Sequence, residues 1–207
     1  STDGNVWTNL ATTGVSSFVA TSLTNGTSLQ FRVFAVNAAV TDLANIATSG
    51  AVATAAVTAL PRTTASAPIA PTSVAGDRQV VLSWTAPADN GGAAITGYTV
   101  QRSTDGGRTW SNALVTTTAA ANATVTGLTN GIAYVFRIAA NNAVGLGAAS
   151  AWVTTAPVAP PVAPSSIGAT AIATGATIAW TAPTDDGGAA IVGYRIELST
   201  DGGTTWT

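Results

Sequence analysis

The sequence QVVLSWTAPADNGGAAITGYTVQRSTDGGRTW, at residues 79–110, decides the fold because it recurs as ATIAWTAPTDDGGAAIVGYRIELSTDGGTTW at residues 176–206. Trp84 and Trp180 occupy the same place in the two copies. A third copy of the tail, STDGNVW, occupies residues 1–7. Self-similarity with a period of about a hundred residues indicates tandem domains, each built from the same set of elements.

The repeated stretch alternates apolar and polar residues, which predicts β-strands with one buried face. Seven short strands are expected in one complete module at residues 72–155. They span residues 72–75, 79–85, 95–102, 110–117, 121–128, 132–141 and 148–155. The expected inward side chains are Val80, Leu82, Trp84, Tyr98, Val100, Tyr134, Phe136, Ile138 and Ala140. Short strands separated by Gly, Pro and Asn turns are typical of a β-sandwich, and no segment has the pattern of a stable helix.

The segments on either side each hold part of the same module. Residues 1–62 match its C-terminal part and residues 165–207 its N-terminal part, with Pro-rich linkers expected at residues 63–71 and 156–164. Half of a sandwich leaves strand edges and an apolar face uncovered. We therefore expect each part-module to be completed either by further sequence of its own chain or by a neighbouring chain.

Strands are also expected in these flanking segments. Residues 15–21 form a short β-rich run, residues 29–35 alternate strictly, and residues 51–60 form a further strand after a long connection. The alternation places Phe34 and Val36 on the nominal outer face, where large apolar side chains are unexpected for an isolated module. In the last segment, Tyr194, Ile196 and Leu198 are expected to face inward, and Arg195 and Glu197 to point outward as a weak pair.

Composition excludes several kinds of chemistry. The 207 residues include no Cys, His or Lys, so a disulfide framework, a thiolate zinc site and a histidine base are absent. Only 8% of residues are charged and the formal net charge is -2, which disfavours a nucleic-acid partner. No apolar run reaches the ~18 residues needed to span a bilayer.

Three stretches together resemble the fibronectin type III domain: LSWTAPADNGG, ITGYTVQRS and VTGLTNGIAYVFRIAANNAVGLG. The turn sequences are similar to those of tandem modules in bacterial secreted and cell-surface proteins. The resemblance implies an all-β chain of tandem immunoglobulin-like sandwiches, one complete and two partial. It also implies a corner in which Leu128 lies beside the Tyr134 hydroxyl. Leu29 stands at the corresponding place in the first segment, so the corner hydroxyl is missing there.

The turns at residues 89–92 and 185–188 carry Asp and Asn side chains that bring oxygen atoms together. A calcium site is one interpretation of these turns. An ordinary Asp-Gly turn is the favoured one, because each turn has at most two carboxylates, and no metal or cofactor is expected. Glu197 is the only Glu, and the many Ser and Thr hydroxyls have no His or Lys base, so the chain is not expected to be an enzyme.

Six side chains are candidates for contact with a neighbouring module or partner. Trp7, Trp110 and Trp206 each follow an STDG turn, where an indole can stack on a sugar or on a neighbour, or can pack over its own sandwich, which is the favoured interpretation. Trp152 immediately precedes the second linker and is the best candidate for an inter-module contact. Phe34 and Val36 complete the set.

The sequence therefore predicts a non-catalytic structural repeat of a secreted or cell-surface protein. The first hypothesis is a subunit or stalk of an extracellular fibre or sheath, whose partners are other copies of itself or neighbouring modules. The alternative is an adhesion module or a carbohydrate-associated spacer of a larger secreted protein or enzyme, with carbohydrate as the partner. Clusters of exposed Trp would favour sugar binding, and outward apolar groups packed on another chain would favour a fibre.

Overall fold

The computed structural model describes residues 1–40, 46 and 51–207. Residues 41–45 and 47–50, most of the long connection expected before residue 51, lie outside that description. The named elements are all strands: β1 (Leu29–Phe31), β2 (Val57–Ala59), β3 (Ile69–Gly76), β4 (Gln79–Thr85), β5 (Ile95–Ser103), β6 (Ser111–Val115), β7 (Asn122–Thr126), β8 (Tyr134–Asn142), β9 (Gly145–Ala149), β10 (Val153–Thr155), β11 (Ser165–Ile172) and β12 (Gly175–Thr181). None of the described residues forms a helix that is long and apolar enough to cross a membrane.

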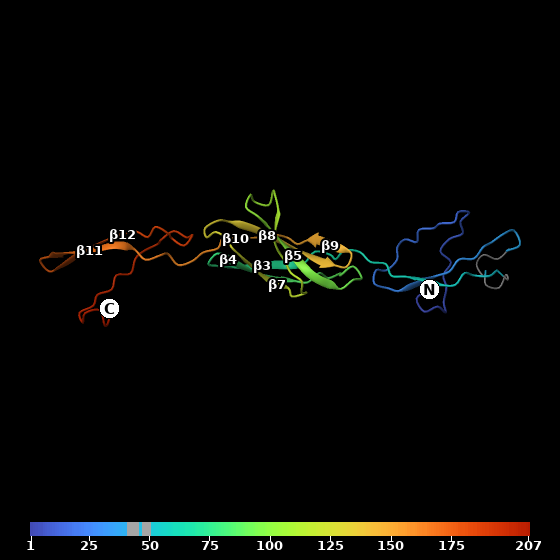
Figure 1. Cartoon of the computed structure of the whole chain (residues 1–207), viewed down its shortest axis with the longest axis horizontal. Coiled ribbons are helices and arrows are strands. Elements are labelled where there is room, and N and C mark those ends of the chain that lie inside the picture. The colour runs from blue at the N-terminus through green and yellow to red at the C-terminus, as the bar shows by residue number, and fades with distance from the viewer. Residues whose placement is uncertain (41–45, 47–50) are drawn as a thin grey trace.

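The central part of the chain forms a β-sandwich, as the alternating pattern predicts. One sheet has the order β3-β4-β7, and the other has the order β10-β8-β5-β6 with β9 also paired to β8. All of these pairings are antiparallel. We call this part, residues 69–155, the middle module. Its first strand, β3, begins at Ile69, inside the linker expected at residues 63–71. Figure 1 shows the middle module between the first segment, residues 1–62, and the third segment, residues 165–207, which lie on opposite sides along the long axis.

The core lies between these two sheets. Every inward side chain expected in β4, β5 and β8 is buried, and Leu82, Tyr98, Val100, Phe136 and Ile138 have no exposed surface. Trp84 packs edge-on against Tyr98, with ring centroids 4.9 Å apart. The fold class is therefore confirmed: the chain is all-β, with an immunoglobulin-like sandwich at its centre.

The corner beside β8 also forms as expected. Leu128 is buried, and the Tyr134 hydroxyl accepts a hydrogen bond from the backbone N–H of Thr129 at 3.1 Å. This bond ties the turn before β8 to the strand itself. Of the described residues, two buried side-chain polar atoms have no hydrogen-bond partner: Nε1 of Trp84 and the hydroxyl of Tyr98.

The last strand of the middle module differs from the prediction. The sequence pattern indicates one strand at residues 148–155, whereas the structure has β9 and β10 separated at Ser150. Ser150 exchanges hydrogen bonds with Ile138 through its backbone N–H at 2.8 Å and through its hydroxyl, which accepts the Ile138 N–H at 3.0 Å. A side-chain oxygen thus takes the place of a backbone carbonyl, and the strand is interrupted there.

The first segment contains less strand than its alternation predicts. Residues 15–21 form no strand, and β1 ends at Phe31. Beyond it, Phe34 forms only an isolated bridge with Ala53, and Val33 is 68% exposed. The predicted strands over residues 29–35 and 51–60 are therefore wrong outside β1 and β2. An alternating pattern becomes a strand only where a second strand is available to pair with it.

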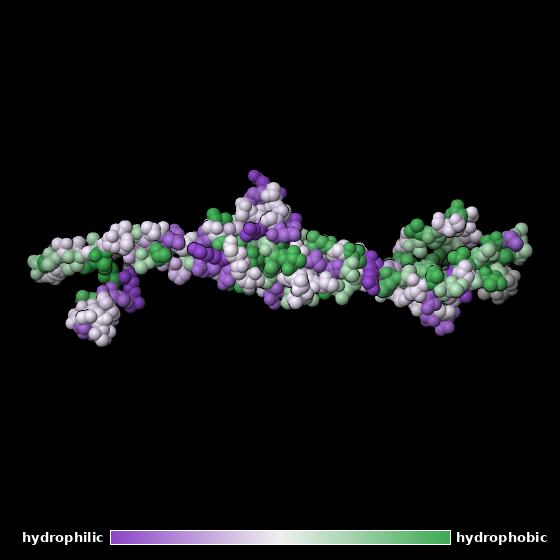
Figure 2. Space-filling view, in the orientation of Figure 1, coloured by the Kyte–Doolittle hydropathy of each residue, from purple (hydrophilic) through white to green (hydrophobic). Residues whose placement is uncertain are grey.

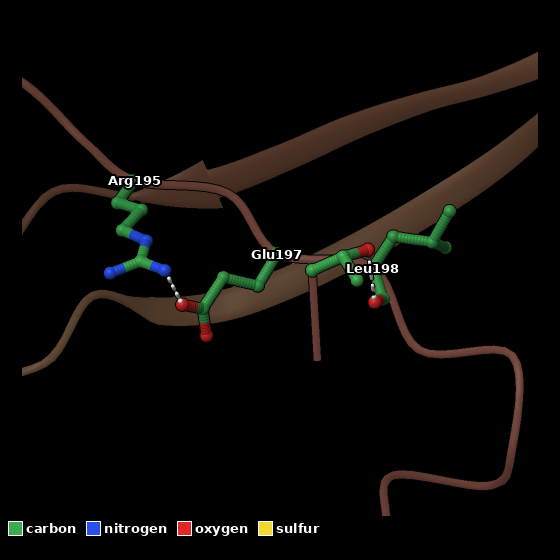
Figure 3. Close-up of polar contacts among 4 residues, drawn as sticks. Arg195, Glu197 and Leu198 are labelled. Atoms are coloured by element: carbon green, nitrogen blue, oxygen red, sulfur yellow. Dashed lines mark hydrogen bonds and ion pairs between the residues drawn. The ribbon is translucent and has the colours of Figure 1, made fainter. Parts of the chain in front are cut away.

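The third segment shows the same dependence on partners. Its β11 and β12 form a two-stranded ribbon, but residues 191–198 are not a strand. Their counterpart β5 is held in place by β8 and β6, whereas no strand of the described residues pairs with residues 191–198. Arg195 and Glu197 form the expected ion pair of 2.7 Å (Figure 3). Arg195 is 83% exposed, so this pair contributes little to stability. The expected inward direction of Tyr194, Ile196 and Leu198 is wrong, because these side chains are 42%, 63% and 66% exposed.

Candidate functional site

The first junction, between the first segment and the middle module, is made by backbone atoms of turns and linker. It consists of the Leu-Thr-Asn-Gly turn at residues 23–26, the linker and the Asp-Asn-Gly-Gly turn at residues 89–92. Three hydrogen bonds hold these parts together: Gly26 N–H to the Pro61 carbonyl at 2.9 Å, Thr63 N–H to the Gly91 carbonyl at 2.8 Å, and Ser66 N–H to the Asp89 carbonyl at 2.9 Å.

The second junction, between the middle module and the third segment, has the same construction. Its turns are residues 128–131 and residues 185–188. The corresponding hydrogen bonds are Gly131 N–H to the Pro157 carbonyl at 2.9 Å, Ala159 N–H to the Gly187 carbonyl at 2.8 Å, and Val162 N–H to the Asp185 carbonyl at 3.1 Å. The same pairs of positions are used at both ends of the middle module.

At each junction one glycine lies directly against another. A β-carbon on Gly92 would lie 2.2 Å from the Gly26 nitrogen, and one on Gly188 would lie 2.3 Å from the Gly131 nitrogen. Gly92 and Gly188 also have positive φ angles of 76° and 86°. Only glycine combines that backbone conformation with so close an approach. Glycine is therefore needed at these positions for two reasons: the turn has a positive φ angle, and the turn of the preceding module lies against it.

Asn142 fastens the first linker to the middle module. Its side-chain NH₂ donates to the Thr63 carbonyl at 2.8 Å and to the Asn90 carbonyl at 2.9 Å, while its Oδ1 accepts the Val144 N–H at 2.9 Å. The residue is only 7% exposed. A single buried amide thus joins the linker, the glycine turn and the end of β8.

The carboxylates of the two glycine turns are engaged by their own backbone. Oδ1 of Asp89 accepts the Gly91 N–H, and Oδ1 of Asp185 accepts the Gly187 N–H, both at 2.8 Å. These are the contacts of an ordinary Asp-Gly turn. Within residues 1–40, 46 and 51–207 there is no group of three or more Asp, Glu, His or Cys that could hold a metal ion.

The STDG turns share a second hydrogen-bond pattern. The Ser103 hydroxyl donates to Asp105 at 2.6 Å and accepts the Gly107 N–H at 2.9 Å. Hydrogen bonds from Ser103 first, and then from Thr109, lower the pKa of Asp105 well below its ordinary value. The pKa of Asp201 is lowered in the same way, chiefly by Thr205. Both carboxylates are therefore ionised, and they hold their turns together by accepting hydrogen bonds.

Trp110 lies on the outer face of the β10-β8-β5-β6 sheet. The guanidinium of Arg137 is 4.1 Å from the Trp110 ring centroid, and Trp152 stacks on Trp110 with centroids 6.2 Å apart and an angle of 28° between the rings. Trp110 is half-buried, whereas Trp152 is 61% exposed. Trp152 thus packs on its own module, and contact with a further module stays a prediction.

The remaining predicted contact residues lie in the flanking segments. Trp7 is half-buried beneath Arg32, whose guanidinium is 4.1 Å from the ring centroid, so the pairing of Trp110 with Arg137 has a counterpart in the first segment. Phe34 is half-buried with its ring 5.1 Å from the same guanidinium. Val36 and Trp206 are 38% and 58% exposed. The six residues do not form one site.

Residues 67–156 match the family model for the fibronectin type III domain. The middle module is a fibronectin type III domain. Of the curated proteins that the chain matches, chitinase A1 of Niallia circulans is 37% identical over 143 residues, which cover 66% of this chain and 18% of the relative. Endoglucanase B of Cellulomonas fimi is 37% identical over 123 residues, which cover 56% of this chain and 11% of the relative. The chain thus spans less than a fifth of either enzyme.

Proteins of other kinds also match. Titin of Drosophila melanogaster is 31% identical over 156 residues, covering 62% of this chain and 1% of titin. Among solved structures, a Fn3-like protein from Clostridium thermocellum has a TM-score of 0.39 at 21% identity, covering 44% of this chain and 92% of that one.

The glycine contacts at the junctions were not among the residues predicted from sequence. The signal was present, because the Leu-Thr-Asn-Gly turn and the Asp-x-Gly-Gly turn each occur twice. What the sequence does not reveal is that the turn of one module lies against that of the next, since the two are about sixty residues apart in the chain.

Proposed function

We propose that this chain is a non-catalytic spacer in which fibronectin type III modules are held at a fixed orientation. The observation that carries the proposal is the repetition of one backbone junction, with its three hydrogen bonds and its glycine contact, at both ends of the middle module. Because the two junctions use the same contacts, each module should have the same orientation relative to the next. We place the linkers at residues 63–68 and 156–164, because β3 begins at Ile69 and the second gap lies between β10 and β11.

We further propose that the spacer belongs to a larger secreted or cell-surface protein. Two relatives of this chain are named chitinase and endoglucanase, and both are much longer than the region they share with it. In such a protein the spacer would separate a polysaccharide-degrading domain from the rest of the chain. The absence of His, Cys and Lys agrees with a part that performs no catalysis itself.

Distances between the modules test the spacer directly. The chain has no cysteine, so spin labels can be introduced at the exposed pair Thr124→Cys and Thr177→Cys, and at Thr58→Cys with Thr124→Cys. Pulsed electron paramagnetic resonance on the full 207-residue chain should give one narrow distance distribution for each pair. Broad distributions for both pairs would show independent modules and would rule out a fixed spacer.

A fibre subunit is the second candidate. The observation that favours it is the apolar surface of the flanking segments, where Val6, Val19, Val52 and Ile167 are each more than 70% exposed. Figure 2 shows much of the first segment in the colours of apolar residues. Negative-stain electron microscopy over a concentration series should then reveal end-to-end filaments, whereas monomers at every concentration would exclude this candidate.

A further inference from the structure

The outer face of the β10-β8-β5-β6 sheet carries a continuous row of hydrogen-bonded polar side chains. Gln101 on β5 is in register with Arg137 on β8 and with Asn112 on β6. Arg137 Nε donates to Gln101 Oε1 at 2.8 Å, and Gln101 Nε2 donates to Asn112 Oδ1 at 3.1 Å. The row therefore crosses three neighbouring strands and holds its side chains in fixed positions.

Two stacked indoles lie at the β10 end of this row. Val153 pairs with Phe136, so Trp152 immediately before it lies beside Arg137. Both Trp110 and Trp152 also lie against the turn between β5 and β6, because a β-carbon on Gly107 would be 3.3 Å and 3.4 Å from their rings. We call Trp110, Trp152, Arg137, Gln101 and Asn112 the tryptophan face.

Trp152 has no counterpart in the first segment. The pairing of Trp110 with Arg137 recurs there as Trp7 with Arg32, so it is a general feature of the modules. Alignment of β10 with β2 places Ala56 where the middle module has Trp152. The covering of the sheet therefore needs only one indole. The second one adds a large, mostly exposed aromatic surface that folding does not explain.

We propose that the tryptophan face binds a neutral saccharide chain. A sugar ring offers a face of C–H groups, which stacks on an aromatic ring, and a rim of hydroxyls, which pairs with amide groups. Trp152 supplies the aromatic surface, while Gln101 and Asn112 supply the amides. The row has one charged member, Arg137, which lies over Trp110 and donates to Gln101, whereas the exposed groups beside it are an indole and amides. These uncharged groups match the C–H face and the hydroxyls of a neutral sugar.

This inference rests on the proposed place of the chain beside a polysaccharide-degrading domain, and it adds a role to the spacer. The probes are cellohexaose and chitohexaose, which represent the substrate classes of the two bacterial relatives. The full 207-residue chain, labelled with ¹⁵N, is titrated with each probe up to about 5 mM, and the tryptophan indole N–H signals are followed by nuclear magnetic resonance.

Saturable shifts of the Trp152 and Trp110 signals with at least one probe are expected. Trp152→Ala should weaken binding about tenfold or more, and Trp152→Phe should restore part of the affinity, because an aromatic surface remains. Trp206→Ala is the matched control: Trp206 is 58% exposed and lies in the third segment, so its loss should leave binding unchanged. Thermal unfolding verifies that each variant is folded.

The inference is overturned if neither probe gives saturable shifts, or if the Trp152 and Trp206 variants lose affinity equally. The spin-label distances separate the two proposals. Trp152→Ala should weaken saccharide binding about tenfold or more while leaving both inter-module distances as they are in the unsubstituted chain. Loss of the narrow distances without loss of binding would instead count against the spacer alone.

Discussion

The Gly188 backbone lies against the Gly131 nitrogen so closely that a single added methyl group would come within 2.3 Å of it. Van der Waals contact between heavy atoms begins at about 3.5 Å, so the two turns would have to separate by roughly 1 Å to admit an alanine. The second junction is thus sensitive to the smallest possible side chain.

Gly188→Ala should therefore loosen the second junction. The distance distribution between labels at Thr124→Cys and Thr177→Cys should broaden, while the distribution across the first junction should remain narrow. Gly202→Ala is the matched control, because Gly202 has a similar φ of 75° and no atom within 4 Å of its added β-carbon. Equal broadening by both substitutions would show that backbone strain, rather than the contact, is responsible.

Asn142→Ala should destabilise the middle module and release the first linker. The carbonyls of Thr63 and Asn90 lose their shared donor, which should cost about 1–2 kcal/mol in the free energy of unfolding. Chemical denaturation measures that loss, and the distance between labels at Thr58→Cys and Thr124→Cys should broaden at the same time. The exposed Asn112→Ala should change stability by no more than about 0.5 kcal/mol.

Tyr98→Phe and Tyr134→Phe should affect stability differently, although each removes one hydroxyl. The Tyr98 hydroxyl is buried without a partner, so its removal should leave stability unchanged or raise it. The Tyr134 hydroxyl accepts the Thr129 N–H, so its removal should cost about 1 kcal/mol. Urea denaturation of both variants checks this, and a larger loss from Tyr98→Phe would contradict it.

Asp105→Asn should reduce the acid sensitivity of the chain. The folded-state pKa of Asp105 lies below its unfolded value, so the stabilisation by its carboxylate is complete above about pH 4 and is lost as the pH falls towards the folded pKa. Melting temperatures measured between pH 2 and pH 7 should fall less steeply for the variant at the acid end. If the melting temperature fell equally steeply with pH in both proteins, the stability of the turn would not depend on the Asp105 charge.

The sequence was sufficient for the core of the middle module, but not for its last strand or for the flanking segments. The inward residues of β4, β5 and β8 and the corner between Leu128 and Tyr134 all follow from local patterns, because every strand there has its partners within the same hundred residues. The alternation at residues 29–35 and 191–198 is equally regular, yet most of it forms no strand. Pairing is a non-local property, and a local pattern does not report whether the partner is present.

The candidate site shows a similar division. Trp7, Trp110 and Trp206 were identifiable from their place after each STDG turn, and Trp152 from its place before the second linker. The sequence did not reveal that Arg137 covers Trp110 while Trp152 stays exposed. The junction was missed because its glycines have no side chains to suggest a contact. Repetition of both turns was the available signal, and the contact between them needed the structure.

The glycine contact has a consequence for how such a chain can change. Because main-chain atoms form three hydrogen bonds of each junction, a module that keeps its two turns and the amide of Asn142 can replace another module with little adjustment of its other side chains. The outer faces of the strands are then free to vary from one module to the next, as Trp152 and Ala56 do at one position. The modules of such an array are interchangeable, because each joins the next through the same backbone junction.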